Sequence, residues 1–317
     1  MKLARYLGGG EVAIVEEPAP ECPVGGLLVQ TVASGLCSGE LMTWYMDRKV
    51  PHVIGHEVSG VVIESQDARF PVGSKVAPHH HAPCLNCDLC LRCAYVHCPT
   101  WKKTKLIPGG MAEQFALSAE NLNDCQRVDD LDFRDAALTE PLACVMKQLR
   151  RLQVQEGETC AVIGLGFMGL LHALCLPGCV AYDLNPARIE WARSQGIDAR
   201  LPENNELAEV IVMCPGTEAA FQFALDLALP DARIGIFSPL PPGALPFDFE
   251  KAYMRDLTLV NSYSCGPDDT AEAVELLRLG SIKADQVVSD FIALDELPEF
   301  YTRMKNGEIL KPMVMFS

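Results

Sequence analysis

The segment TCAVIGLGFMG, residues 159–169, gives the strongest indication of the fold. Its first five residues form a short apolar run, which is typical of a buried strand. Gly164, Gly166 and Gly169 then have the G-x-G-x-x-G spacing, and the apolar residues after them predict a helix. A strand, a glycine turn and a helix in this order indicate one unit of a doubly wound parallel sheet. We therefore predict an α/β fold.

The glycine turn has the composition of a dinucleotide-binding site. Gly164 permits the tight turn, Gly166 lets the backbone approach a pyrophosphate, and Gly169 lets the helix pack closely on the strand. The start of the helix adds free N–H groups and a partial positive charge. The predicted cofactor-binding segment is Gly164, Leu165, Gly166, Phe167, Met168 and Gly169. A flavin site and a plain strand–helix turn are the alternatives.

An acidic residue follows the next predicted strand, residues 179–182. From the position of Asp183, a carboxylate can bind both ribose hydroxyls of NAD. The same carboxylate would repel a 2′-phosphate, so NAD is favoured over NADP. Arg188 instead favours NADP, because a nearby arginine can accept a 2′-phosphate. Arg188 also fits a solvated helix face.

Alternating strands and helices continue this pattern along the chain. Predicted strands are 210–213, 233–237 and 257–262, and predicted helices are 186–195, 217–228 and 268–279. Such alternation is typical of a parallel sheet.

The first 145 or so residues are instead rich in Gly, Pro, Val and His. They hold the predicted strands 27–32, 58–63 and 75–77, which indicates an irregular β-rich domain.

Four cysteines, Cys84, Cys87, Cys90 and Cys98, have the spacing C-x2-C-x2-C-x7-C. Four thiolates close a tetrahedral shell around zinc, and a closed shell holds structure rather than doing chemistry. Disulfides or unconnected thiols are the alternative. Metal is favoured because we expect the cysteines of a chain without an export signal to be reduced.

Cys37, His56, Glu57 and Glu140 form a second, mixed set of possible zinc ligands. Shells of this composition usually keep a position open, and an open zinc lowers the pKa of a bound alcohol. Each residue alone also fits a buried thiol or an ordinary polar group. Their occurrence beside a four-cysteine lobe and a nucleotide fold favours a catalytic zinc.

On these motifs the chain resembles the zinc-containing medium-chain dehydrogenase/reductase family, and within it the polyol (sorbitol-type) and threonine dehydrogenase branches. The resemblance covers nearly the whole chain and implies a GroES-like catalytic domain, a Rossmann domain, and Cys37 and His56 as catalytic zinc ligands. Glu57 is similar to a direct ligand in the polyol branch and to a carboxylate behind the ligands in others. Glu140, in Glu140-Pro141-Leu142, matches a carboxylate that binds zinc directly or through water, with Cys144 as the alternative.

The resemblance also implies the domain organisation. Residues 1–147 are expected to form the GroES-like catalytic domain with the zinc lobe at about 84–98, residues 148–281 the Rossmann NAD-binding domain, and residues 282–317 a C-terminal segment that returns to the catalytic domain. The chain is short for this family. Because residues 170–176 and 198–210 leave little room for helices, we predict a trimmed Rossmann domain.

The sequence departs from the family pattern near the first ligand. Cys-Gly-Ser/Thr-Asp is replaced by Cys37-Ser38-Gly39-Glu40, and Met42 stands where a histidine is often found. The hydroxyl that relays the alcohol proton is therefore missing at Gly39. We expect the proton to leave through Ser38, or through water and Glu57 or Glu140.

A run of three histidines, His79-His80-His81, precedes the four-cysteine lobe. We expect a solvated or backbone-bonded loop here. A ring that reaches the catalytic cleft is the alternative.

Composition limits the partners. The net charge of −16 argues against nucleic-acid binding, and no apolar run approaches the roughly 20 residues that span a bilayer. The N-terminal residues show no signal-peptide core, so we expect a cytoplasmic protein. The family resemblance implies a homodimer or homotetramer, with the predicted strand 257–262 at the contact.

These features predict an oxidoreductase that holds two Zn²⁺ per chain, one catalytic and one structural. It would transfer a hydride between a secondary alcohol or polyol and NAD. An NADPH-dependent aldehyde or ketone reductase of the same fold is one alternative. A non-catalytic zinc- or nucleotide-binding relative is the other.

Overall fold

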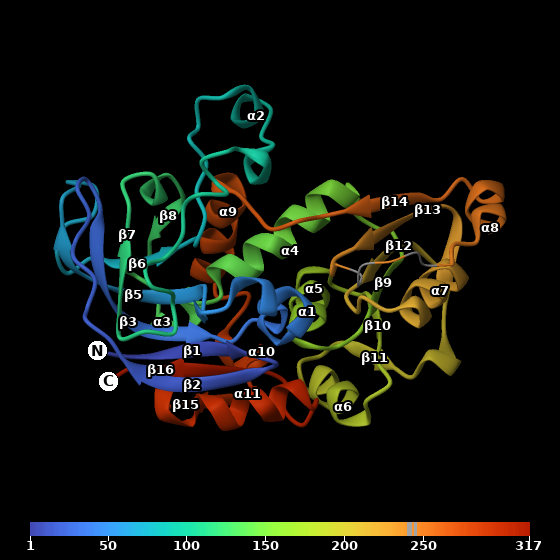
Figure 1. The fold of residues 1–317 in the computed structure, drawn as a ribbon. Coiled ribbons are helices and arrows are strands. Elements are labelled where there is room, and N and C mark those ends of the chain that lie inside the picture. The colour runs from blue at the N-terminus through green and yellow to red at the C-terminus, as the bar shows by residue number, and fades with distance from the viewer. Residues whose placement is uncertain (240–242, 244–245) are drawn as a thin grey trace. The chain divides into compact units, whose positions relative to one another are not determined.

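A computed structural model describes residues 1–239, 243 and 246–317 of the chain (Figure 1). The chain forms two compact units. Unit 1 comprises Met1–Ala143 and Cys265–Ser317, and unit 2 comprises Cys144–Ser264. Within the described residues, no helix has the length and apolar character required to cross a membrane.

A seven-stranded, mainly antiparallel sheet organises unit 1, in the order β15-β16-β3-β5-β6-β8 with β7 paired to β3. The strands are β3 (Leu27–Gly35), β5 (Glu57–Ser65), β6 (Lys75–Pro78), β7 (Gln114–Leu117), β8 (Cys125–Arg127), β15 (Asp290–Ile292) and β16 (Pro312–Met315). The predicted strands 27–32, 58–63 and 75–77 lie in β3, β5 and β6. Alternate residues such as Val58, Val62 and Phe115 point into one apolar core.

A smaller sheet of three strands, β2-β1-β4, lies in the same unit. Its strands are β1 (Lys2–Gly8), β2 (Glu11–Glu16) and β4 (His52–Val53). The helix α11 (Leu297–Lys305) contacts β2 and β16 through an apolar stripe. Leu297, Tyr301 and Met304 of this stripe lie in a core cluster with residues of β1. The C-terminal segment therefore completes the core of unit 1.

Short helices connect the strands of unit 1. They are η1 (Ser38–Leu41), α1 (Thr43–Met46), η2 (Asp47–Lys49), α2 (Asp88–Leu91), η3 (Tyr95–His97), η4 (Asn121–Asp124), α3 (Phe133–Ala136), α10 (Ala284–Val287) and η6 (Leu294–Glu296). The longer α4 (Thr139–Leu152) begins in unit 1 and includes the first residues of unit 2.

The helix α9 (Pro267–Arg278) belongs to unit 1, so the chain returns there at Cys265 and not at the expected residue 282. α9 contacts β8 and α3 through its buried face, which includes Ala273, Val274 and Leu277. The helical pattern in the sequence shows which residues of α9 are buried, but not which sheet buries them.

Unit 2 is a six-stranded parallel sheet in the order β11-β10-β9-β12-β13-β14, seen as one layer in Figure 1. The strands are β9 (Cys160–Ile163), β10 (Val180–Tyr182), β11 (Asp198–Arg200), β12 (Ala208–Met213), β13 (Ala228–Ile236) and β14 (Thr258–Asn261). Its helices are α5 (Phe167–Cys175), α6 (Pro186–Ser194), α7 (Glu218–Leu227) and α8 (Phe249–Met254). The predicted doubly wound α/β sheet is confirmed. The order reverses beside β9, because β10 and β12 pair with its two sides.

Two connections of this sheet are short, as the sequence predicts. The helix α5 has nine residues and ends before Pro177-Gly178, where Gly178 has a positive φ of 83°. Between β11 and β12 the chain forms only the 3₁₀ turn η5 (Pro202–Asn204). The strand β14 lies at one edge of the sheet and pairs with β13.

Candidate metal centres and nucleotide-binding turn

The four spaced cysteines meet in one small lobe of unit 1. Their sulfur atoms all lie within 4.8 Å of one another, and the described cysteines are all free thiols. Sγ–Sγ distances are 3.9 Å for Cys84–Cys90, 3.5 Å for Cys87–Cys90 and 3.6 Å for Cys98–Cys84. A tetrahedral zinc with Zn–S bonds of about 2.3 Å separates its sulfurs by about 3.8 Å. The donor set therefore fits zinc, and the disulfide alternative is wrong.

Backbone N–H groups of the lobe favour the thiolate form of Cys98. Burial raises the pKa of Cys98, but backbone N–H groups, including that of Cys84, lower it more, to about 6. The side chains of Val96 and Trp101 are buried against the sulfurs. Cys93 lies outside the set and is exposed. The lobe has little other core, so a bound metal would contribute directly to its stability.

Three of the four residues in the mixed set of possible zinc ligands lie together in unit 1. Donor atoms of Cys37, His56 and Glu57 lie within 4.8 Å of one another. Cys37 caps η1, and the Gly39 N–H donates to its Sγ at 3.4 Å. His56 and Glu57 follow Gly55, whose φ of 94° turns the chain into β5. Thiolate, imidazole and carboxylate together fit zinc with an open position.

Glu40 orients the His56 ring. Its Oε1 accepts a hydrogen bond from the Gly55 N–H at 2.7 Å and lies 3.1 Å from His56 Nδ1. The Tyr301 hydroxyl donates to the Glu40 carbonyl at 2.8 Å and holds this turn in place. Burial lowers the pKa of His56, but Cys37 and Glu40 raise it more, so it ends well above its usual range. A histidine that donates from Nδ1 to a carboxylate presents Nε2 to a metal.

Lys311 stands behind Glu57. Its Nζ forms an ion pair with Glu57 Oε2 and donates to the Leu36 carbonyl at 3.0 Å. Both side chains are almost completely buried. The ion pair compensates the negative charge of Glu57 and links β5 to the residue before β16.

Glu140 belongs to a different group of donor atoms in unit 1. It does not group with Cys37 and His56, but a donor atom of Glu140 lies within 4.8 Å of donors of His79 and His80. Glu140 and His79 are buried, and the His79 ring contacts the Asp124 side chain, so the expectation of a solvated or backbone-bonded loop is wrong for His79. It is confirmed for His81, whose Nδ1 lies 2.5 Å from the Thr104 carbonyl oxygen. Burial and the neighbouring histidines lower the pKa of His80 well below its usual range. Ser38 begins η1 and is exposed.

The glycine turn follows β9, where the strand order of unit 2 reverses. Gly164 has a φ of 86°, and a Cβ at Gly169 would collide with the carbonyl oxygen of Gly164. A Cβ at Gly166 would meet nothing within 4 Å. The turn is therefore tight, closely packed against the helix, and open at Gly166. These features fit a pyrophosphate at the start of α5, formed by Phe167, Met168 and the residues after them.

Asp183 follows β10 and contacts this turn. Its Oδ2 accepts a hydrogen bond from the Leu165 N–H at 2.6 Å, and its Oδ1 accepts one from the Asn185 N–H at 2.8 Å. Arg188 Nη1 lies 3.8 Å from Asp183 Oδ2. The carboxylate is thus fixed beside the glycine turn, and the arginine faces the carboxylate.

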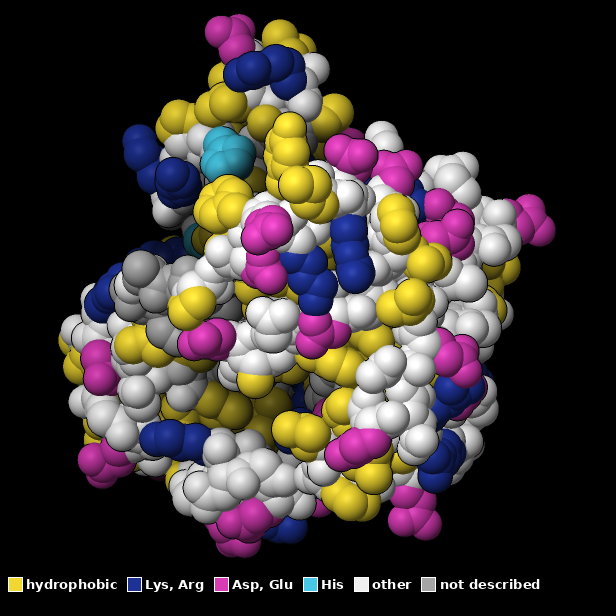
Figure 2. Space-filling view, turned by 90° about the vertical axis from the view of Figure 1, so that its right-hand side faces the viewer, with side chains coloured by type: hydrophobic (Ala, Val, Ile, Leu, Met, Phe, Trp, Pro, Cys, Tyr) yellow, Lys and Arg dark blue, Asp and Glu magenta, His cyan; other side chains and the backbone are white. Residues whose placement is uncertain are grey.

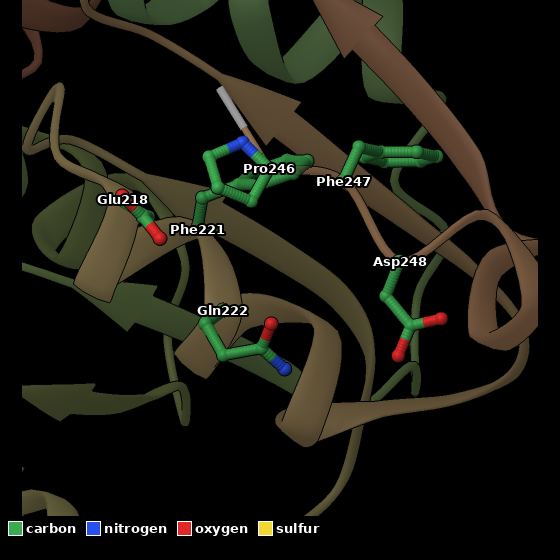
Figure 3. Close-up of a pocket in the computed structure, with 6 residues that line it drawn as sticks. All are labelled: Glu218, Phe221, Gln222, Pro246, Phe247 and Asp248. Atoms are coloured by element: carbon green, nitrogen blue, oxygen red, sulfur yellow. The ribbon is translucent and has the colours of Figure 1, made fainter. Parts of the chain in front are cut away.

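A further pocket of unit 2 lies between α7 and residues 246–248 (Figure 3). Its volume is about 280 Å³. The lining residues are Glu218, Phe221, Gln222, Pro246, Phe247 and Asp248. This lining holds no cysteine, histidine or residue of the glycine turn, so it does not carry the chemistry of the other sites.

Comparisons with known proteins agree with this geometry. Residues 24–127 match the family model of the alcohol dehydrogenase GroES-like domain. The chain is 26% identical to sorbitol dehydrogenase of Halalkalibacterium halodurans, over 97% of this chain and 96% of that protein. It is 27% identical to D-altritol 5-dehydrogenase of Agrobacterium fabrum, over 96% of each.

These matches support a medium-chain zinc dehydrogenase of polyol type. The fold of alcohol dehydrogenase TADH from Thermus sp. ATN1 agrees, with a TM-score of 0.89 over the full length of both chains at 22% identity. The GroES-like and Rossmann-type architecture is thereby confirmed. A dehydrogenase of this family uses zinc and a nicotinamide cofactor.

Sequence reasoning missed several residues that support the metal centres of this dehydrogenase. The sequence showed Glu40 only as an acidic residue in the altered Cys37-Ser38-Gly39-Glu40 segment and did not predict its contact with His56. Lys311 and Asp124 gave no signal, because each meets its partner across the fold: Lys311 pairs with Glu57, and Asp124 Oδ2 lies 2.9 Å from His79 Nδ1. Of the three consecutive histidines, His80 lies beside His56, with ring centroids 4.7 Å apart.

Proposed function

We propose that this dehydrogenase transfers a hydride between a secondary alcohol or polyol and NAD, with Cys37, His56 and Glu57 as the catalytic zinc donors. One observation carries the proposal: these three donors lie within 4.8 Å of one another in a chain that also holds a complete dinucleotide turn. The polyol dehydrogenases among its relatives support the substrate class.

Each residue has a defined task in this scheme. When bound, zinc polarises the alcohol oxygen and nicotinamide accepts the hydride. Cys37 and His56 hold the metal, and Glu40 keeps the His56 ring in position. Lys311 forms an ion pair with Glu57, so this buried carboxylate has a positive partner. Four further thiolates, Cys84, Cys87, Cys90 and Cys98, hold the structural zinc.

Asp183 supports NAD as the cofactor. Its carboxylate is fixed by two backbone N–H groups beside the glycine turn, and a 2′-phosphate there would meet a negative charge. Arg188 Nη1 lies 3.8 Å from Asp183 Oδ2, so the arginine already forms an ion pair with that carboxylate. NADP would need both side chains to rearrange.

A homo-oligomer in the cytoplasm is part of the proposal. The strand β14 lies at the edge of the unit 2 sheet, where a second copy can continue the pairing. On the face shown in Figure 2, lysine and arginine side chains stand among acidic ones. Together with the net charge of −16, this favours a small-molecule substrate over a nucleic acid.

A metal analysis combined with a panel of secondary alcohols and polyols tests the function. We expect NADH formation with at least one polyol and a lower kcat/KM with NADP. A Cys37→Ser variant should lose the activity, whereas a Cys22→Ser variant, outside every metal group of the described residues, should retain it. Activity only with NADPH and a carbonyl substrate would support the reductase alternative. Bound zinc without turnover of any substrate would support the non-catalytic one.

A further inference from the structure

We propose that His79, His80 and Glu140 hold a divalent transition-metal ion in a site of their own. One ligand atom of each lies within 4.8 Å of the other two. All three residues belong to unit 1, His79 is 1% exposed and Glu140 is 8% exposed. Two imidazoles and a carboxylate at this separation form a typical donor set for zinc or cobalt.

The His79 ring is already oriented for a metal. Its Nδ1 lies 2.9 Å from Asp124 Oδ2, and Asp124 Oδ1 accepts a hydrogen bond from Thr270 Oγ1 at 2.6 Å. The Asp124 side chain is fully buried, so this chain of contacts is rigid. A carboxylate that accepts the Nδ1 proton leaves the lone pair on Nε2, which is the arrangement of metal-binding histidines.

His80 supplies an independent indication. Its Nδ1 is buried and has no hydrogen-bond partner within the described part of the chain. A buried polar atom without a partner costs about 1–3 kcal/mol. The ring of His80 lies between those of His56 and His79, with centroid distances of 4.7 and 4.8 Å. A metal ion bound at this Nδ1 would remove the cost.

A soft donor adjoins the same site. Cys265 Sγ lies 3.7 Å from His79 Nε2. In a tetrahedral zinc site, ligand bonds of about 2.0–2.1 Å to nitrogen and 2.3 Å to sulfur separate the two donors by about 3.6 Å. Cys265 therefore lies at the distance from His79 that two ligands of one zinc ion have. A set with nitrogen and sulfur donors selects zinc-like ions over magnesium and calcium, which prefer oxygen.

Metal counting on the full chain tests the proposal without any activity assay. The protein is reconstituted with excess zinc, desalted, and its zinc content is measured per chain. Wild type should carry one equivalent more than a His79→Gln/His80→Gln variant. His81→Gln is the matched control, because the neighbouring His81 lies outside the group and contacts the Thr104 carbonyl instead. It should carry as much zinc as wild type.

Cobalt identifies the ligands. Glu140→Gln should remove the same equivalent of bound metal as His79→Gln/His80→Gln. Cys37→Ser should remove a different equivalent, so the combined Glu140→Gln/Cys37→Ser variant should lose two. Cys265→Ser should abolish the sulfur-to-cobalt charge-transfer band of this site. Asp124→Asn, which leaves the ligands intact, should weaken cobalt binding about 10–100-fold.

Equal zinc content in wild type and His79→Gln/His80→Gln would overturn the proposal, even if the variant melts at a lower temperature. Loss of one and the same equivalent in Glu140→Gln and Cys37→Ser would also overturn it, since Glu140 would then serve the Cys37 site. Neither result bears on alcohol oxidation, which is measured separately.

Discussion

The ammonium group of Lys311 and the carboxylate of Glu57 form a buried ion pair directly behind the Cys37–His56–Glu57 group. The pair joins the start of β5 to the residue before β16. It thus connects the candidate catalytic metal site to the C-terminal strand of the unit 1 sheet.

Replacing Lys311 by Met should destabilise unit 1 strongly. The change leaves Glu57 as an uncompensated buried carboxylate, which typically costs about 3–5 kcal/mol. Urea denaturation should show this loss, while Lys305→Met, at an exposed position of α11, should change the midpoint little. A loss below about 1 kcal/mol would mean that the ion pair contributes little to the stability of unit 1.

Replacing Glu40 by Gln should weaken the catalytic metal site. The neutral amide no longer accepts the His56 Nδ1 proton as a carboxylate does, and such a change lowers metal affinity about 10–100-fold. Competition with a chelator measures the affinity. Glu11→Gln, at an exposed position of β2, is the control. Unchanged affinity would show that the His56 ring is held by other contacts.

Replacing Cys87 by Ser should remove the structural zinc and leave the Cys37 group loaded. The zinc content should fall by one equivalent, and limited proteolysis should cut the lobe faster, since the lobe has little core of its own. Cys93→Ser is a matched control in the same lobe, because Cys93 is exposed and lies outside the set of four. If both variants lose zinc, the ligand set is misassigned.

Replacing Asp183 by Asn should reduce the preference for NAD. The loss of charged hydrogen bonds to the ribose, worth about 1.5–3 kcal/mol, corresponds to about a 10–100-fold fall in kcat/KM with NAD. Use of NADP should rise, and a second change, Arg188→Ala, should reverse that rise, because the arginine lies 3.8 Å from Asp183 in the native site. An unchanged cofactor ratio would refute the role of Asp183.

Replacing His172 by Gln should reduce the sensitivity of unit 2 to acid. Burial lowers the pKa of this fully buried side chain from 6.5 to about 4. Between these pH values the unfolded chain binds a proton that the folded chain does not, so stability falls as the pH decreases from about 6.5 to 4. The loss reaches about 3 kcal/mol for this group. Denaturation at several pH values should show a shallower fall for the variant, and His97→Gln, at an exposed site, should behave as wild type.

The parts of the fold that sequence could predict are those with a short-range physical signal. The three glycines of the turn are separated by two and three positions, and each has a backbone reason that the structure bears out. The four cysteines of the lobe span only residues 84–98, so their spacing alone brings the sulfurs together.

The remaining features depend on partners far apart in the chain. Lys311 and Glu57 belong to opposite ends of the sequence. His79 meets Asp124 because β6 pairs with β8, which places Pro78 opposite Cys125. The sequence of helix α9 has an ordinary amphipathic pattern. This pattern does not indicate that its apolar face packs against α3 and β8. Glu140 was assigned to the Cys37 site by resemblance, and its neighbours in space are two histidines that the resemblance did not include.

The pairing of β3 with β16 has a consequence for the order of events on the ribosome. Gly35 of β3 lies opposite Met313, so the strand emerges long before its neighbour has been synthesised. At roughly 5–20 residues per second, the delay is on the order of tens of seconds. All six strands of unit 2 leave the ribosome within that interval. The inserted unit can therefore fold first, while the flank of β3 that later receives β16 waits exposed in the nascent chain.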